Sequence, residues 1–118
     1  MKKPKIILMG LFLFIGTFAV YAQNLPSVRI VNNTGYDVFY VYISPEENEF
    51  WGDDFLGEDD VLENGQTVTF RLSQPLTRTK VYDIRLVDEE GDSYIKMGVT
   101  ITNNARIVFT MDDLADDE

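Results

Sequence analysis

Short apolar segments with a two-residue period, separated by turn residues, recur along this chain from residue 27 onward. In one of them, Val68, Phe70 and Leu72 alternate with polar residues. A two-residue period places alternate side chains on opposite faces of a β-strand, so each such segment predicts a strand with one buried face. The expected strands are residues 27–32, 36–43, 66–72, 80–87, 93–102 and 105–111.

These strands, with turn residues such as Gly35, Gly65 and Gly91 between them, predict an all-β fold. We expect a compact antiparallel β-sandwich of about six to seven strands, with a small β-barrel as the alternative. Residues 23–111 would form this single β domain. The acidic residues 112–118 would form a disordered tail.

The first 22 residues have the three-part pattern of a secretory signal peptide. Lys2, Lys3 and Lys5 are followed by an uncharged, mostly apolar run over residues 6–20. This run is shorter than the roughly 20 residues that span a bilayer. The sequence therefore predicts cleavage after Ala22 and a periplasmic or secreted protein, without membrane insertion after cleavage.

The chain has no cysteine and no histidine. Disulfides, thiol nucleophiles and zinc sites made of these residues are therefore excluded, and so is the commonest general base. No Gly-x-Ser-x-Gly motif and no phosphate-binding glycine loop occurs in the sequence. Carboxylate pairs remain for acid–base chemistry, but they lie in highly charged segments where nothing predicts a raised pKa. We therefore expect a protein that is not an enzyme.

The chain is strongly acidic, with 20 Asp and Glu against 10 Lys and Arg, and loss of the three leader lysines takes the net charge from −10 to −13. Such a charge repels nucleic acids and anionic lipids. The expected partners are a basic protein, a divalent cation or a neutral ligand. Alternatively, the charge serves only solubility.

The acidic residues concentrate in three segments: residues 44–65, residues 88–92 and the tail after residue 111. If each strand reverses the direction of the one before it, these segments meet at one end of the domain. Carboxylates from converging loops can bind calcium. The candidate ligands are Asp53, Asp54, Asp59, Asp60, Asp88 and Asp92. The alternative is a solvated, repulsive surface that binds no metal.

The segment 36–43 is apolar or aromatic on both faces. We expect the side with Phe39 to enter the core, which leaves Tyr40 and Tyr42 on the opposite face. Trp51 lies in the long loop that follows. This loop either folds back to pack its aromatic side chains on the sheet, or forms with the two tyrosines an exposed platform for a sugar or peptide.

Several short motifs occur in a characteristic order. They are Asn33-Thr34-Gly35-Tyr36, Val41-Tyr42-Ile43-Ser44-Pro45, Trp51-Gly52-Asp53-Asp54, Leu56-Gly57, Leu62 with Gly65, Tyr82-Asp83-Ile84, and Asp88 with Gly91-Asp92. Together they cover nearly all of the mature domain, which on these motifs resembles a group of small exported bacterial proteins without an assigned activity. Proteins of this group often carry cysteines near the later strands, which this chain lacks. The resemblance implies a β domain at the cell envelope and supplies no catalytic residue or ligand.

Taken together, these features favour a non-enzymatic exported binding or interaction module whose acidic loop end contacts the partner. The alternatives are a structural envelope component, whose acidic surface serves only solubility, and a calcium-binding β domain.

Overall fold

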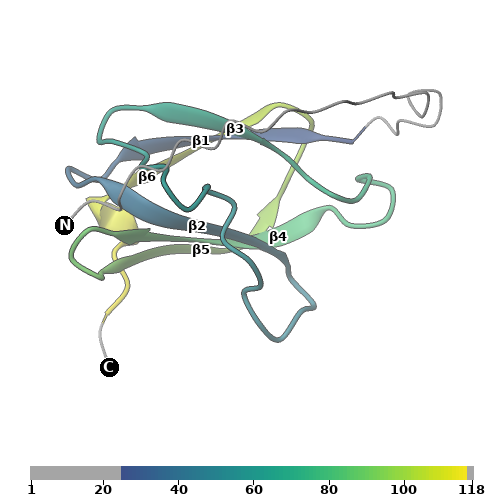
Figure 1. The fold of residues 1–118 in the computed structure, drawn as a ribbon. Helices are drawn as coiled ribbons and strands as arrows, with labels where there is room; N and C mark the ends of the chain where they lie inside the picture. The colour runs from purple at the N-terminus through teal and green to yellow at the C-terminus, as the bar shows by residue number, and fades with distance from the viewer. Residues whose placement is uncertain (1–24, 117–118) are drawn as a thin grey trace.

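The computed structural model describes residues 25–116, which form a β-sandwich of two three-stranded sheets (Figure 1). The expected signal peptide, residues 1–22, lies outside the described residues. Within them, no helix is long and apolar enough to cross a membrane. The strands are β1 (Ser27–Asn33), β2 (Val38–Pro45), β3 (Thr67–Arg71), β4 (Val81–Asp88), β5 (Ser93–Thr100) and β6 (Ala105–Thr110). The predicted all-β sandwich is confirmed.

The two sheets differ in strand direction. One sheet, here the β4 sheet, has the order β2-β4-β5 and is antiparallel throughout. The other, the β1 sheet, has the order β3-β1-β6, with an antiparallel pair β1–β3 and a parallel pair β1–β6. The expectation of a wholly antiparallel sandwich is therefore wrong at one strand pair.

The core lies between the sheets and is built from the inward-facing residues of each strand. Ile84 and Leu86 of β4 are fully buried, as is Phe109 of β6. Full burial of such a side chain contributes roughly 1.5–3 kcal/mol relative to its exposure. Val41 and Ile43 of β2, on the side of the strand expected to face inward, belong to this core, and Phe39 on the same predicted side is buried.

The chain does not reverse direction at the long connection between β2 and β3. In the β4 sheet, Val38 pairs with Asp88 at one end and Pro45 pairs with Tyr82 at the other. The connection leaves β2 at the Pro45 end and returns to the Val38 end, where Leu62 exchanges two backbone hydrogen bonds with Val38, each 2.9 Å long. β2 and β3 therefore run in the same direction, and the expected strict alternation is wrong at this point. The cause is that β3 pairs with β1 in the opposite sheet, so the loop must travel back along β2.

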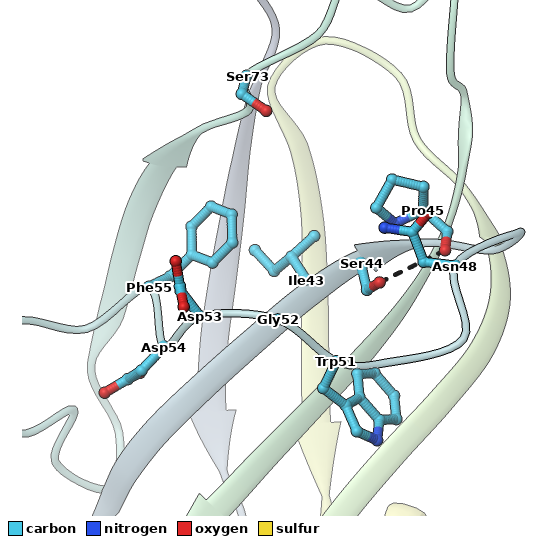
Figure 2. A pocket seen from close by; sticks show the side chains of 10 residues that line it. All are labelled: Ile43, Ser44, Pro45, Asn48, Trp51, Gly52, Asp53, Asp54, Phe55 and Ser73. Carbon is cyan, nitrogen blue, oxygen red and sulfur yellow. Dashed lines mark hydrogen bonds between the residues drawn. The ribbon is translucent and has the colours of Figure 1, made fainter.

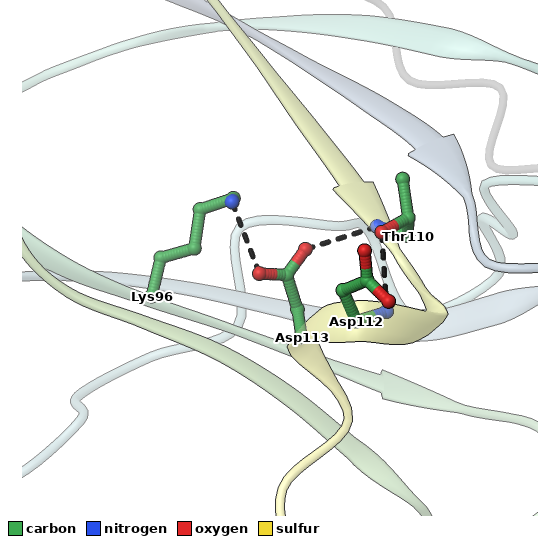
Figure 3. Close-up of polar contacts among 4 residues, drawn as sticks. All are labelled: Lys96, Thr110, Asp112 and Asp113. Carbon is green, nitrogen blue, oxygen red and sulfur yellow. Dashed lines mark hydrogen bonds and ion pairs between the residues drawn. The ribbon is translucent and has the colours of Figure 1, made fainter.

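The tail is ordered where the structure describes it, which corrects the expected disorder of residues 112–116. Residues Met111–Asp113 form a 3₁₀ helix, η2. Its first turn is capped by Thr110, whose hydroxyl accepts from Asp112 N at 3.1 Å while its N–H donates to Asp113 Oδ2 at 3.0 Å (Figure 3). The other carboxylate oxygen of Asp113 lies 3.0 Å from Lys96 Nζ. Capping and this ion pair compensate the acidic charge that predicted disorder.

Candidate functional site

Tyr40 and Tyr42 lie on the face of β2 opposite to the core residues Val41 and Ile43, after a β-bulge at the start of the strand. The register with β4 shifts between Val38 and Tyr40, so that Val38 and Phe39 are both buried although they are consecutive. After the bulge the two-residue alternation resumes, and it directs Tyr40 and Tyr42 to the outer face of the β4 sheet. Tyr40 is 38% exposed there.

Three aromatic side chains and one arginine form a continuous surface on this face. The rings of Tyr40 and Tyr42 are stacked, with centroids 6.4 Å apart and planes at 6°. The rings of Tyr42 and Trp51 are tilted at 49°, with centroids 6.5 Å apart. The guanidinium of Arg85 lies 5.7 Å from the Tyr42 centroid and 5.9 Å from the Trp51 centroid, within the range of cation–π attraction. We call these four residues the aromatic face.

Thus the structure brings together all three residues that the sequence pattern identified as a candidate platform, namely Tyr40, Tyr42 and Trp51. The sequence reasoning missed Arg85. Its position in the strand could have identified it, because Arg85 stands between the core residues Ile84 and Leu86 and so must point outward.

The loop segment that carries Trp51 is fixed to β2 by hydrogen bonds on both sides of the tryptophan. Ser44 Oγ donates to the Phe50 carbonyl at 3.1 Å. Asp54 Oδ1 accepts from the backbone N–H groups of Val41 and Leu56, both at 2.9 Å. Phe55 N donates to the Val41 carbonyl at 2.7 Å. These bonds place the Trp51 segment along the outer edge of β2.

Two hollows flank this loop segment. The larger, of about 390 Å³, has an apolar floor of Ile43 and Phe55 and the carboxylates of Asp53 and Asp54 at its side. In Figure 2 the side chains of Ile43 and Phe55 lie on one side of the loop backbone and the indole of Trp51 on the other. The larger hollow therefore belongs mainly to the edge of the sandwich rather than to the aromatic face.

The smaller hollow, of about 150 Å³, opens beside the aromatic face. Trp51 and two prominently exposed apolar side chains line it: Phe50, which is 77% exposed, and Met97, which is 66% exposed. The carboxylates of Glu49 and Asp83 complete its charged lining. Apolar surface and negative charge thus occur side by side at this position.

The pKa of the central phenol of the face, that of Tyr42, is raised. Burial raises the pKa of Tyr42 above its ordinary value of 10.0, and the negative charge of Asp54 raises it further, against the opposing effect of Arg85. Tyr42 therefore retains its hydroxyl proton at physiological pH and can donate a hydrogen bond to a ligand.

The six candidate calcium ligands do not gather into one site. Within residues 25–116, no group of three or more Asp and Glu is placed to hold a metal ion. Asp53 lines the larger hollow, and Asp54 holds the backbone beside Val41, in the middle of β2. Asp60 Oδ2 accepts from Gly57 N at 3.2 Å inside the loop.

The remaining candidates are Asp59, Asp88 and Asp92. They lie near the Val38 end of the β4 sheet or are partly or fully buried. Asp88 is buried where β4 ends, and its carboxylate accepts from Glu90 N, Asp92 N and the Tyr94 hydroxyl. Asp92 thus contributes its N–H to this turn. The Asp59 side chain is partly buried, and its Oδ1 has no hydrogen-bond partner among the described residues.

The acidic segments are divided between the two ends of the sandwich. Glu46 follows β2 at its Pro45 end, where its N–H donates to the Val81 carbonyl. The 88–92 turn lies at the Val38 end, where Glu89 N donates to the Asp37 carbonyl. The expected single acidic pole is therefore wrong, because the long loop runs the length of β2 instead of remaining at one end.

Comparison of the chain with protein families, with curated proteins and with solved structures gives no match.

Proposed function

We propose that this protein is a non-enzymatic, exported binding module and that the aromatic face contacts a partner protein whose interface has a basic rim. The observation that carries the proposal is the assembly of Tyr40, Tyr42, Trp51 and Arg85 into one connected surface on the outside of the β4 sheet. None of the four residues belongs to the hydrophobic core between the sheets.

The composition of the face supports a protein partner. Tyr, Trp, Phe, Met and Arg are the residues enriched in the centres of protein interfaces, and Trp, Tyr and Arg dominate their binding energy. Phe50 and Met97 extend the same composition beyond the four residues of the face. Burial of these side chains under a partner would remove a large apolar area from water.

The charge around the face supports a basic rim on that partner. Glu49 and Asp83 lie next to the exposed apolar side chains, and Asp54 lies close enough to Tyr42 to raise its pKa. Arg85 places one positive charge at the centre of the face, but its guanidinium lies over two aromatic rings. Complementary charge would speed encounter and make binding weaken with salt.

A paired-variant capture experiment tests the proposal. The mature chain is immobilised and exposed to an envelope extract at low salt and at about 0.5 M salt, where screening acts within a few ångströms. Three baits are used: wild type, Phe50→Ser/Met97→Gln in the exposed apolar surface that adjoins the aromatic face at Trp51, and Met111→Gln/Leu114→Ser elsewhere. Both variants remove two exposed apolar side chains, so they should reduce non-specific hydrophobic binding to a similar extent.

Each captured protein is then purified and titrated against the three baits. The proposal is supported if one protein binds wild type and Met111→Gln/Leu114→Ser equally, binds Phe50→Ser/Met97→Gln at least about tenfold more weakly, and loses affinity with salt. It is overturned if every captured protein binds Phe50→Ser/Met97→Gln as tightly as wild type. Absence of any captured protein at either salt concentration also overturns it and favours a structural envelope component.

A further inference from the structure

The smaller hollow beside the aromatic face has the dimensions of a single side chain. Its volume is about 150 Å³, whereas sites for whole small molecules typically occupy about 300–1,000 Å³. The lining consists of Ser44, Asn48, Glu49, Phe50, Trp51, Asp83 and Met97. A hollow of this size within an interface accepts one anchoring side chain of the partner.

The charged lining of the hollow determines whether that side chain should be positively charged, neutral or negatively charged. Glu49 and Asp83 are the ionisable side chains of the hollow, and both are carboxylates. The nearby Arg85 does not line it, and its Nε donates to Ser93 Oγ at 3.0 Å. An anionic occupant would meet two like charges there, while a neutral occupant would offer no positive charge to either carboxylate.

Asp83 is held in position before any ligand arrives. Its Oδ1 accepts a 2.8 Å hydrogen bond from Gly98 N, across the bulge in the pairing of β4 with β5. Gly98 has a φ of 64°, a left-handed conformation that glycine adopts without the penalty of other residues. The bulge therefore presents a fixed carboxylate to the hollow, which reduces the ordering cost of binding.

The walls select for a polarisable and partly apolar occupant. Trp51 and Phe50 supply aromatic rings, and Met97 supplies a flexible thioether. Aromatic faces attract ammonium groups by cation–π interaction, and methylene groups gain contact with the same rings. We infer that the hollow receives the extended side chain of a lysine from the partner, with its methylenes against the rings and its ammonium between Glu49 and Asp83.

This inference rests on the proposed function for the identity of the partner, but the hollow can be tested without it. The probes are n-butylammonium, which reproduces the lysine side chain, with 1-butanol and butyrate as neutral and anionic counterparts. Trp51 is the single tryptophan of the sequence, so its fluorescence reports on the hollow directly. Backbone amide shifts in the NMR spectrum of the full mature chain locate the binding.

The expected result is saturable binding of n-butylammonium, with amide shifts centred on residues 48–51 and 97, and at least about fivefold weaker binding of 1-butanol. Glu49→Gln and Asp83→Asn should each weaken n-butylammonium by about two- to fivefold, the effect of a partly exposed ion pair. Asn at position 83 keeps an acceptor for Gly98, so the bulge is preserved. Glu58→Gln, an exposed change elsewhere in the loop, should have no effect.

The inference is overturned if 1-butanol or butyrate binds as well as n-butylammonium, if n-butylammonium causes no saturable change, or if both carboxylate variants bind it like wild type. These outcomes are distinct from failure of the proposed function. If the wild-type chain binds n-butylammonium but its Phe50→Ser/Met97→Gln variant still captures the partner, the proposed function alone is overturned. If Phe50→Ser/Met97→Gln weakens binding of the partner but n-butylammonium shows no saturable binding to the wild-type chain, the inference alone is overturned.

Discussion

The hydroxyl of Tyr94 donates a 2.7 Å hydrogen bond to Oδ2 of Asp88 in the interior of the sandwich. The other carboxylate oxygen of Asp88 accepts from the N–H groups of Glu90 and Asp92 at 2.8 and 3.0 Å. One buried carboxylate thus fixes the turn between β4 and β5 and joins it to the core. Asp88 is a structural anchor, and its oxygens are already engaged by groups of the protein.

Because of this pair, the free energy of unfolding should decrease at alkaline pH. Burial raises the pKa of Tyr94, and the Asp88 carboxylate raises it further. A raised tyrosine pKa stabilises the fold fully below the unfolded value of 10.0, and this contribution is lost as pH rises through the folded value. Burial shifts Tyr42 and Tyr82 in the same direction. We expect the free energy of unfolding, measured with urea, to fall as pH rises above about 10.

Tyr94→Phe separates the contribution of this phenol from the rest. At neutral pH it should lower the free energy of unfolding by about 1–3 kcal/mol, because a buried carboxylate oxygen loses its donor. It should also reduce the fall in stability above pH 10.0, since one raised tyrosine has been removed. An unchanged alkaline profile would show that Tyr94 does not couple folding to pH.

Asp54 should be a stability residue as well as a neighbour of the aromatic face. Asp54→Ala removes the acceptor of two backbone N–H groups and should cost about 1–3 kcal/mol in urea unfolding, together with a shift in Trp51 emission. Asp54→Asn keeps an acceptor oxygen and should cost clearly less. The adjacent, exposed Asp53→Ala is the matched control and should stay within about 0.5 kcal/mol of wild type. Equal effects of the two alanine variants would contradict the assignment.

Arg85 should couple energetically to Trp51. A double-mutant cycle with Arg85→Gln and Trp51→Leu should give a coupling free energy of about 0.5–1 kcal/mol, the size of a cation–π contact near the surface. The measurement is urea unfolding of the four proteins by circular dichroism, which does not need the tryptophan. Arg71→Gln on β3 in place of Arg85→Gln should give no coupling, and a coupling of equal size there would refute a specific contact.

The ion pair between Lys96 and Asp113 should hold the tail on β5. Lys96→Gln should speed hydrogen exchange at the Ala115 amide, which donates to the Ser93 carbonyl, with a stability cost of about 0.2–1 kcal/mol. Asp113→Ala should have the larger effect, because Asp113 also accepts from Thr110 N. Exchange at Ala115 that is equal in all three proteins would show that the tail is held by its backbone contacts alone.

The local part of the fold could be predicted from sequence, since it depends on local rules. The alternation of Val68 and Phe70 with polar residues identifies β3, and the same reasoning finds the other five strands. Strand direction could not be derived in this way. A two-residue period says which side chains share a face, but the parallel pairing of β1 with β6 depends on contacts distant in sequence.

The candidate site was predictable to the extent that it depends on one strand and its neighbouring loop. Tyr40 and Tyr42 share a face by periodicity, and Trp51 follows closely enough to return to them. The calcium hypothesis required distant loops to converge, and it relied on strict strand alternation. Asp54 and Asp88 show why the acidic pattern does not by itself indicate a metal site. The Asp54 carboxylate accepts from Leu56 N of its own loop and from Val41 N of β2, and the Asp88 carboxylate accepts from Glu90 N and Asp92 N of its own turn.

The return of the long loop along β2 has a consequence for self-association. An open strand edge offers unpaired N–H and C=O groups on which another chain can build a sheet and, eventually, a fibre. On β2 this edge is occupied by Asp54, Phe55 and Leu62 of the same chain. Edge-to-edge polymerisation is thereby blocked along this side of the β4 sheet, so the aromatic face can be displayed beside it without seeding aggregates.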